Sequence, residues 1–338
     1  MNYLPSYISL QYTEDLIGTL QKELGLTSDE ISKAKELLDK CLPPLVRPEV
    51  LSFLFGISNR FIYSMSRSSD QYYRVYKISK KRGGTRQIEA PRRYLKLIQR
   101  WIYYHILRTH ELPPEVTGFV RGKNIFSNAK PHISSKNLMV LDIKDFFPSV
   151  GLKEVVKIFR SFGFSIKVSN LLAGLCTFES RLPQGAPTSP TLANLAFLPV
   201  DLALQDLAKG WDCKYTRYAD DIAFSGDTYF HRKNMTEVSK IVCQWGFHIN
   251  YKKSRIIGSG GRQILAGLVV NTSGLPPRYN RRRWRAMFHK AAHEPSQYLG
   301  QASKLKGIAA FVNEYNNEYN KELATNYFNI ADKTTELG

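Results

Sequence analysis

Two adjacent aspartates, Asp220 and Asp221, lie in the middle of an apolar and aromatic stretch, RYADDIAFSGD. Neighbouring side chains of a β-strand point to opposite faces, so a regular strand here would bury one of the two carboxylates at a large cost in free energy. A hairpin removes this conflict. We therefore predict strands at 215–218 and 222–225, joined by a tight connection at Ala219-Asp220-Asp221. The simpler alternative is that aspartate is a common turn residue without further function.

A third carboxylate gives the pair a chemical meaning. Asp142 closes an apolar stretch in LDIKDFFPSV, predicted as a strand at 137–143. Strands of this kind are usually interior, so the carboxylate at the strand's end needs a partner. Asp142, Asp220 and Asp221 form a candidate site for two divalent cations about 4 Å apart, an arrangement that suits phosphoryl transfer.

The chain carries a large excess of positive charge. It has 48 Lys and Arg against 29 Asp and Glu, a formal net charge of +19. Nucleic acid is the partner that such an excess most often indicates, because each neutralised phosphate releases a condensed counterion. An anionic membrane surface is the rival explanation, but no basic amphipathic helix or lipidation motif supports it.

The cysteines and the start of the sequence predict a cytoplasmic protein with no membrane association. The four cysteines, which form no C-x-x-C pair, indicate neither a zinc site nor a disulfide framework. The start, MNYLPSYISLQYTED, lacks the basic and apolar regions of a signal peptide. The stretch LANLAFLPVDLAL is too short to span a bilayer and contains Asp201.

Helical and strand-like patterns alternate along the chain. A hairpin is predicted from 72–79 and 85–90, with the basic tip KKRGG, and short strands are predicted at 247–250, 255–258 and 264–270. The capping-box pattern Thr27-Ser28-Asp29-Glu30 predicts the start of a helix. Further helices are predicted within 12–42, 48–66, 92–110, 151–180, 189–209 and 231–245, and from about 278 onward. This interleaving predicts an α+β fold.

Four segments in order, LDIKDFFPSV, LPQGAPTSP, YADD and GFHINYKKS, resemble the palm motifs of reverse transcriptases. The likeness runs from about Tyr72 to beyond Asn271. It implies a right-hand polymerase fold with fingers, a palm made of an antiparallel sheet plus helices, and a helical thumb. The implied boundaries are an N-terminal helical region at 1–70, fingers at 71–136, a palm at 137–275 with finger-associated helices at about 151–180, and an RNA-binding thumb at 276–338.

The resemblance also implies roles for individual residues. Asp142, Asp220 and Asp221 correspond to the catalytic carboxylates that bind two Mg²⁺ ions. Phe147 corresponds to the ring that excludes a ribose 2′-hydroxyl, and Gln184 to a residue that contacts the incoming deoxynucleoside triphosphate. The cations expected near the nucleotide's phosphates are Arg74, Lys80 and Arg86, together with Lys252 or Lys253 beside the departing pyrophosphate.

Within that family, SNAKPH matches the NAxxH sequence of bacterial retron enzymes through Asn128 and His132. Where those enzymes usually carry VTG after the palm, this chain has Leu265-Ala266-Gly267, and its own VTG, Val116 to Gly118, lies before the palm. The retron likeness implies a structured noncoding RNA that is both template and primer, and a branched RNA–DNA product (msDNA) begun on a guanosine 2′-hydroxyl. It also implies a role in defence against phage with an effector protein. The sequence does not indicate the oligomeric state.

Cations alternate with aromatic residues near the C-terminus, in PPRYNRRRWRAMFHKAAH. Such a run is often only a solvated helix face, but this spacing also suits an RNA backbone with exposed bases. The residues predicted to bind RNA are Asn128 and His132, by resemblance, and Arg278, Arg281, Arg282, Arg283, Trp284 and Arg285.

Two other functions fit parts of this pattern. One is a reduced reverse transcriptase of the group II intron type, which an intron RNA around the gene would favour. The other is a non-catalytic RNA-binding scaffold that retains the fold, which the presence of all three carboxylates and Gln184 disfavours.

Overall fold

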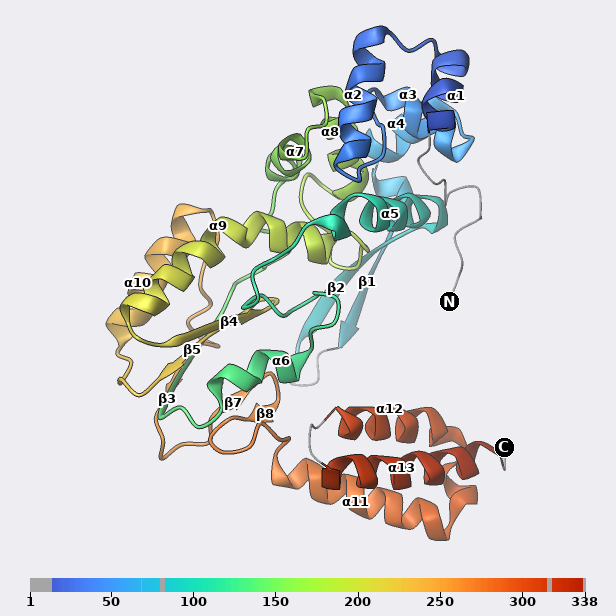
Figure 1. The fold of residues 1–338 in the computed structure, drawn as a ribbon. Coiled ribbons are helices and arrows are strands. Elements are labelled where there is room, and N and C mark those ends of the chain that lie inside the picture. Colours follow the sequence, from blue (N-terminus) through green and yellow to red (C-terminus); the bar gives the residue numbers. More distant parts are fainter. Residues whose placement is uncertain (1–13, 68, 80–82, 315–317, 337–338) are drawn as a thin grey trace.

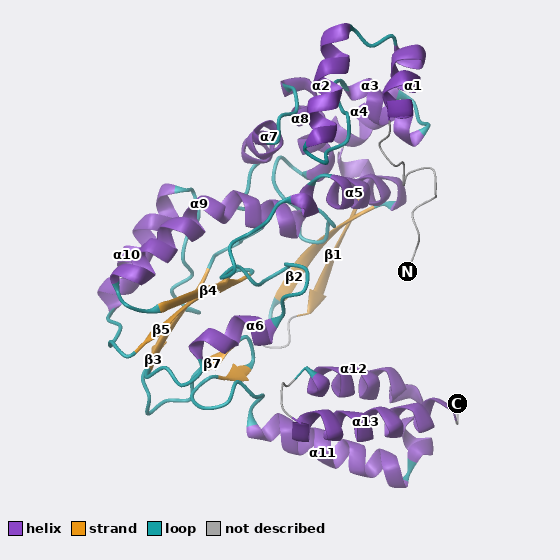
Figure 2. Ribbon diagram, in the orientation of Figure 1, coloured by secondary structure: helices purple, strands orange, loops and turns teal. Residues whose placement is uncertain are grey.

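The computed structural model describes residues 14–67, 69–79, 83–314 and 318–336. The chain forms an elongated molecule with a helical N-terminal part, a central sheet covered by helices, and a C-terminal helical bundle (Figures 1 and 2). The mixed α+β class predicted from the sequence is confirmed. Among the described residues, no helix combines the length and the apolar character needed to cross a membrane.

Four helices build the N-terminal part: α1 (Glu14–Leu24), α2 (Ser28–Asp39), α3 (Pro48–Phe55) and α4 (Asn59–Arg67). Thr27 caps α2 and exchanges hydrogen bonds with Glu30, as the capping box predicts. The single helix expected over 48–66 is wrong. Gly56 adopts φ +62° and ends α3, because glycine enters the left-handed region without a side-chain clash.

A two-stranded antiparallel hairpin leads into the centre of the molecule. Strands β1 (Tyr73–Ser79) and β2 (Thr85–Pro91) pair as predicted, and helix α5 (Arg93–His105) follows them. Most of the hairpin is exposed, so it projects away from the core. Residues 80–82 of the basic tip, which include the predicted phosphate-binding Lys80, lie outside the described residues.

The central sheet is antiparallel, with the strand order β4-β5-β3-β6. Its strands are β3 (Asn137–Asp142), β4 (Lys214–Tyr218), β5 (Asp221–Gly226) and β6 (Arg255–Ile257). The strand predicted at 247–250 is reduced to an isolated bridge between Ile249 and Ile143. Every residue of β3 is buried, as expected for an internal strand with both faces covered.

Each face of the sheet has its own apolar core. Met139, Leu141 and Phe224 join the large core that includes α9 (Ser189–Gly210) and α10 (Arg232–Gln244), whereas Leu138 and Val140 face a smaller core. Helix α6 (Ile125–Ala129) and the hairpin of β7 (Ile264–Leu265) and β8 (Leu268–Val269) complete the region of the sheet. Helices α7 (Leu152–Ser161) and α8 (Ile166–Cys176) lie beside the N-terminal helices, where α8 packs against α4 (Figure 1).

The C-terminal bundle contains α11 (Arg278–His293), α12 (Ala302–Asn313) and α13 (Glu318–Glu336). Its helices share a core in which the rings of Phe288 and Tyr327 stack with centroids 3.7 Å apart. The bundle touches the central part through Phe311, whose ring centroid lies 5.3 Å from that of Phe126. It therefore has an apolar core separate from that of the sheet.

This separation predicts a local response to a core mutation. Phe288→Ala removes a ring that is 1% exposed, and should cost the bundle about 3–5 kcal/mol through lost burial and the cavity left behind. Hydrogen exchange measured by mass spectrometry should show faster exchange in 278–336, with β3 and β5 unchanged. Tyr279→Ala, at a ring that is 68% exposed on the same helix, is the control. Equal loss of protection in the sheet would show that the two parts unfold together.

Candidate active site

The three aspartates lie together at one end of the central sheet. Asp142 ends β3 and pairs directly with Asp221, which begins β5. A two-residue turn, Ala219-Asp220, joins β4 to β5, with Ala219 at φ +57°. The main-chain N–H of Ile143 donates to the carbonyl of Asp220 at 2.8 Å, which holds the turn against β3. The predicted hairpin is confirmed, with Asp221 in the strand rather than in the turn.

These carboxylates repel one another in a poorly hydrated place. Burial, followed by the neighbouring charges of Asp220 and Asp142, raises the pKa of Asp221 to about 6. Burial also raises the pKa of Asp220, with a smaller contribution from Asp142, while Lys253 and Arg86 oppose the shift. Like charges on directly opposed strand positions are destabilising, so repulsion between these carboxylates lowers the stability of this end of the sheet, and a bound cation would reduce that repulsion.

Lys253 and Asn250 bind the innermost carboxylate. Asp142 is 6% exposed and accepts hydrogen bonds from Lys253 Nζ at 2.9 and 3.0 Å and from Asn250 Nδ2 at 3.0 Å. The hydrogen bond to Asp142, followed by attraction to the carboxylates, raises the pKa of Lys253. The ammonium group therefore stands as a positive charge among the three acids.

The donor set suits a hard divalent cation. Carboxylate oxygens are the ligands that Mg²⁺ prefers, and a cation would relieve the repulsion that adds to burial in raising the pKa values of Asp220 and Asp221. In the part of the chain that the structure describes, no group of three or more His, Cys, Asp or Glu side chains is already gathered at ligating distance. Asp142 is instead turned to Lys253, so its carboxylate would have to exchange the ammonium for a metal ion.

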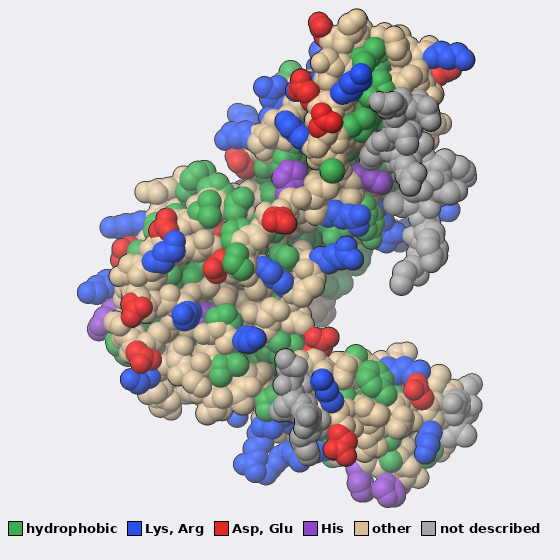
Figure 3. Space-filling model, in the orientation of Figure 1, with side chains coloured by type: hydrophobic (Ala, Val, Ile, Leu, Met, Phe, Trp, Pro, Cys, Tyr) green, Lys and Arg blue, Asp and Glu red, His purple; other side chains and the backbone are tan. Residues whose placement is uncertain are grey.

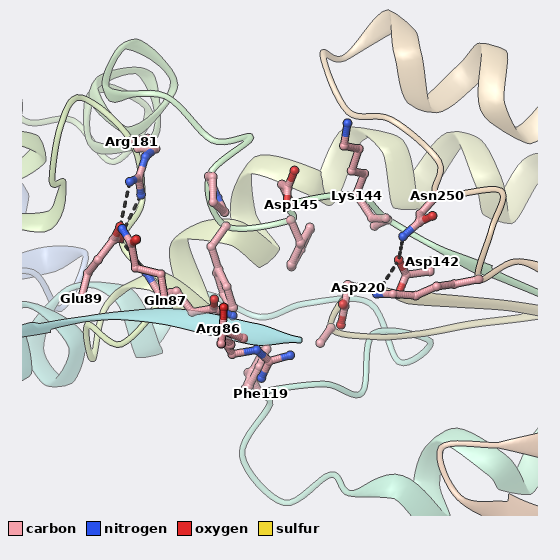
Figure 4. A pocket seen from close by; sticks show the side chains of 18 residues that line it. Arg86, Gln87, Glu89, Phe119, Asp142, Lys144, Asp145, Arg181, Asp220 and Asn250 are labelled. Atoms are coloured by element: carbon pink, nitrogen blue, oxygen red, sulfur yellow. Dashed lines mark hydrogen bonds and ion pairs between the residues drawn. The ribbon is translucent and has the colours of Figure 1, made fainter. Parts of the chain in front are cut away.

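A cavity of about 610 Å³ opens at this end of the sheet, and Asp142 and Asp220 line it whereas Asp221 does not (Figure 4). Of the residues predicted to contact the nucleotide, Arg86, Phe147, Gln184 and Lys253 line it, whereas Arg74 and Lys252 do not. Lys252 is exposed. The structure thus favours Lys253 over Lys252 as the lysine that acts at this site.

Glu89 holds the loop that carries Gln184. Its carboxylate accepts two hydrogen bonds from Arg181, at 2.7 and 2.9 Å, and one from the Gln184 N–H at 3.2 Å. Burial favours a higher pKa for Glu89, but these hydrogen bonds and one from Gln87 keep the pKa below its usual value. Gly185 follows at φ +139°, and a Cβ there would lie 3.0 Å from the Glu89 carbonyl oxygen. The loop is therefore fixed against β2.

Comparison with known proteins identifies the chemistry of this site. The family described as "Reverse transcriptase (RNA-dependent DNA polymerase)" matches residues 78–302. The retron Mx65 reverse transcriptase of Myxococcus xanthus is 33% identical over 80% of this chain and 67% of its own length. The retron Ec86 reverse transcriptase of Escherichia coli is 31% identical over 76% of this chain and 81% of its own. The chain belongs to the retron reverse transcriptases.

A buried ion pair supports the turn of this reverse transcriptase, and we did not predict it. Arg217 and Asp201 are both fully buried and form two hydrogen bonds, at 2.6 and 2.7 Å. The Arg217 guanidinium also donates to the Ala219 carbonyl at 3.1 Å and to Asn194 Oδ1 at 2.9 Å. The signal was present in the sequence, because both charges stand in apolar segments where each needs a partner.

The structure does not support direct RNA contact by Asn128 and His132, because these side chains are 1% and 0% exposed. The ring nitrogens of His132 lie 2.7 Å from the hydroxyls of Ser225 and Thr216, and burial lowers its pKa to about 4. Asn128 Oδ1 accepts from the Thr117 hydroxyl at 3.0 Å. In the reverse transcriptase both residues support the central sheet from within.

The cationic helix α11 is divided between surface and core. Arg278, Arg282, Arg283 and Arg285 are exposed, as RNA contact requires. Arg281 is half-buried and donates to the Pro276 carbonyl. The prediction that Trp284 offers a free face to RNA bases is not supported, because its ring packs edge-on against Phe311 in the bundle core.

The roles of the Arg217–Asp201 pair in stability and in activity can be separated by mutation. Arg217→Met should cost about 3–5 kcal/mol, because it leaves the Asp201 carboxylate buried without its cation. The Tyr215 hydroxyl also donates to Asp201, at 2.6 Å. The triple variant Arg217→Met/Asp201→Leu/Tyr215→Phe, which removes both charges and this hydroxyl, should therefore recover most of the loss in denaturant unfolding. Its primer-extension rate should stay low, because the Ala219 carbonyl has lost its donor. A triple variant with parental stability and parental rate would show that Arg217 does not position the turn.

The raised pKa of Asp221 predicts that replacing it with a neutral residue increases thermal stability at neutral pH but not at acid pH. The folded pKa of about 6 lies above that of the unfolded chain, so the folded state loses stability as pH rises from about 4 through 6. In buffer with EDTA, Asp221→Asn should therefore melt several degrees above the parent at pH 7.5 and close to it at pH 4.5. Asp206→Asn, at a side chain that is 76% exposed, is the control. A parent at least as stable as Asp221→Asn at pH 7.5 would contradict the prediction.

Proposed function

We propose that this retron reverse transcriptase copies part of its own noncoding RNA into a branched RNA–DNA product, msDNA, begun on a guanosine 2′-hydroxyl. The meeting of Asp142 and Asp220 in a cavity that Phe147 and Gln184 also line, with Asp221 directly opposite Asp142 in the sheet, is the observation that carries the proposal. The retron relatives support the RNA partner and the product class. The enzyme would act in the cytoplasm within an antiphage system that includes an effector protein.

In this proposal the three aspartates hold two Mg²⁺ ions, which lower the pKa of the attacking hydroxyl and stabilise the oxygen that leaves. Phe147, half-buried behind the cavity, limits the space beside the sugar and so favours deoxynucleotides. Arg86, near the start of β2, binds the triphosphate, since its guanidinium lines the cavity and its charge reaches Asp220. Lys253 leaves Asp142 to bind, and protonate, the departing pyrophosphate.

The arrangement of the parts also supports a right-hand polymerase. We propose that β1, β2 and α5 form the fingers, the central sheet the palm, and the C-terminal bundle an RNA-binding thumb. The molecule is hollowed between the part that carries α5 and this bundle, and Lys and Arg side chains gather near the start of α11 (Figure 3). Such a hollow suits a template–primer duplex, and the cations near the start of α11 suit its phosphates.

A single substitution tests the assignment of the metal ligands. Asp220→Asn should lower primer extension on a primed RNA template by at least about a thousandfold, because loss of one anionic ligand weakens the metal site that stabilises the transition state. Asp206→Asn, at an exposed ion pair on α9, should extend like the parent. Extension by Asp220→Asn at the parental rate would refute the assignment. A separate experiment tests the retron product. Nucleic acid that co-purifies with the parent protein should be sensitive to both RNase and DNase.

A further inference from the structure

Phe119 combines backbone strain with exposure inside the polymerase cavity. Its φ is +61°, in the left-handed region that side chains larger than those of Gly, Asn or Asp rarely enter. Its side chain is 48% exposed and lines the cavity over Asp220. The ring centroid lies 5.9 Å from that of Phe147. In Figure 4, Phe119 lies beside Arg86 on the wall of the cavity nearest β2.

The segment before Phe119 is fastened to β4. Val116 forms a parallel bridge with Arg217, the Thr117 N–H donates to the Arg217 carbonyl at 2.9 Å, and the Arg217 N–H donates to the Glu115 carbonyl at 3.0 Å. The Thr117 hydroxyl donates to the same Arg217 carbonyl and to Asn128 Oδ1, both at 3.0 Å. The Val116–Gly118 segment, which had no assigned role in the sequence, is thus an added edge of the sheet beside the aspartates.

Gly118 brings this segment against the catalytic turn. A Cβ on Gly118 would lie 2.2 Å from the Ala219 main-chain nitrogen, so no other residue fits there without moving the turn. The Gly118 carbonyl accepts from Asn194 Nδ2 at 2.9 Å, which fixes it to α9 as well. This close contact restricts the path of the backbone after Gly118. At the next residue the chain turns, and the Phe119 side chain enters the cavity.

Neither packing nor turn formation accounts for a phenylalanine at this position. A ring that is 48% exposed adds little to the core, and glycine would make the same turn without strain. Strained residues of this kind collect where the side chain meets a ligand. An exposed aromatic face in a cavity that Arg86, Asp142 and Asp220 also line suits the base of a nucleotide.

We propose that Phe119 is a nucleotide-binding residue whose ring packs against the base of the incoming deoxynucleoside triphosphate, next to Phe147 at the sugar. This inference rests on the proposed polymerase function of the cavity. Asn128 then acts indirectly, as a positioning residue that holds Thr117 and through it the start of the Phe119 turn.

Single-nucleotide incorporation under single-turnover conditions tests the proposal, because it separates the apparent Kd of the nucleotide from the rate of chemistry. Phe119→Ala should raise that Kd about tenfold, near the low end of a base–aromatic stacking contact, and change the rate less than about threefold. Phe119→Tyr should keep the parental Kd. Phe119→Gly should weaken the nucleotide as Phe119→Ala does, but unfold about 2 °C or more above it, because only glycine relieves the strain.

Phe53→Ala, at a 36% exposed phenylalanine on α3, is the matched control and should leave the nucleotide Kd unchanged. An unchanged nucleotide Kd in Phe119→Ala would overturn the inference, as would a change confined to the Kd of the RNA template. Phe119→Gly melting no higher than Phe119→Ala would overturn the assignment of strain. A parent that incorporates no nucleotide would refute the proposed function instead, and the comparison of unfolding temperatures would still hold.

Discussion

The buried contact between Arg217 and Asp201 joins the two elements on which the site depends. Arg217 lies in β4, two residues before the Ala219-Asp220 turn, and Asp201 lies on α9, the helix that follows the Gln184 loop. Removing both charges from water costs several kcal/mol for each ion, and their attraction at 2.6 Å with further hydrogen bonds offsets this cost. Such a pair adds little net stability. Its effect is to allow one register between β4 and α9, because any shift would leave a charge buried alone.

With that register fixed, the sheet can bring like charges together at its end. Backbone pairing places Asp142 opposite Asp221, and the Ile143 N–H holds the Asp220 carbonyl, so none of the three carboxylates is needed to maintain the fold. Burial, with their mutual repulsion added to it, raises the pKa values of Asp220 and Asp221, and Lys253 offsets the shift only in part. A site under this electrostatic stress binds cations more strongly than a relaxed one would, because binding removes the repulsion as well as adding new contacts.

Features that depend on residues close together in the sequence were predicted correctly. The hairpin at Asp220, the apolar strand ending at Asp142 and the capping box at Thr27 all depend on neighbouring residues, and all three are found. Contacts between distant segments escaped prediction. Burial of His132 against β4 and β5, and of Trp284 against Phe311, depends on packing partners that spacing along the chain does not reveal. The choice of Lys253 over Lys252 likewise needed the position of Asp142.

Main-chain hydrogen bonds hold the walls of the cavity, which leaves the side chains of these segments available to contact a substrate. Its walls come from segments far apart in the chain, and main-chain hydrogen bonds join them: Glu89 to Gln184, Thr117 to Arg217, and Asn250 to Asp142. Because the backbone holds these segments, side chains such as Phe119, Arg86 and Gln184 are left to face the cavity. A substrate that enters therefore meets groups already in place, so little of its binding free energy is spent on ordering the protein. Lys253 is the exception, because its ammonium is bound to Asp142; in the proposed reaction it would have to exchange this carboxylate for the pyrophosphate when cations bind the aspartates.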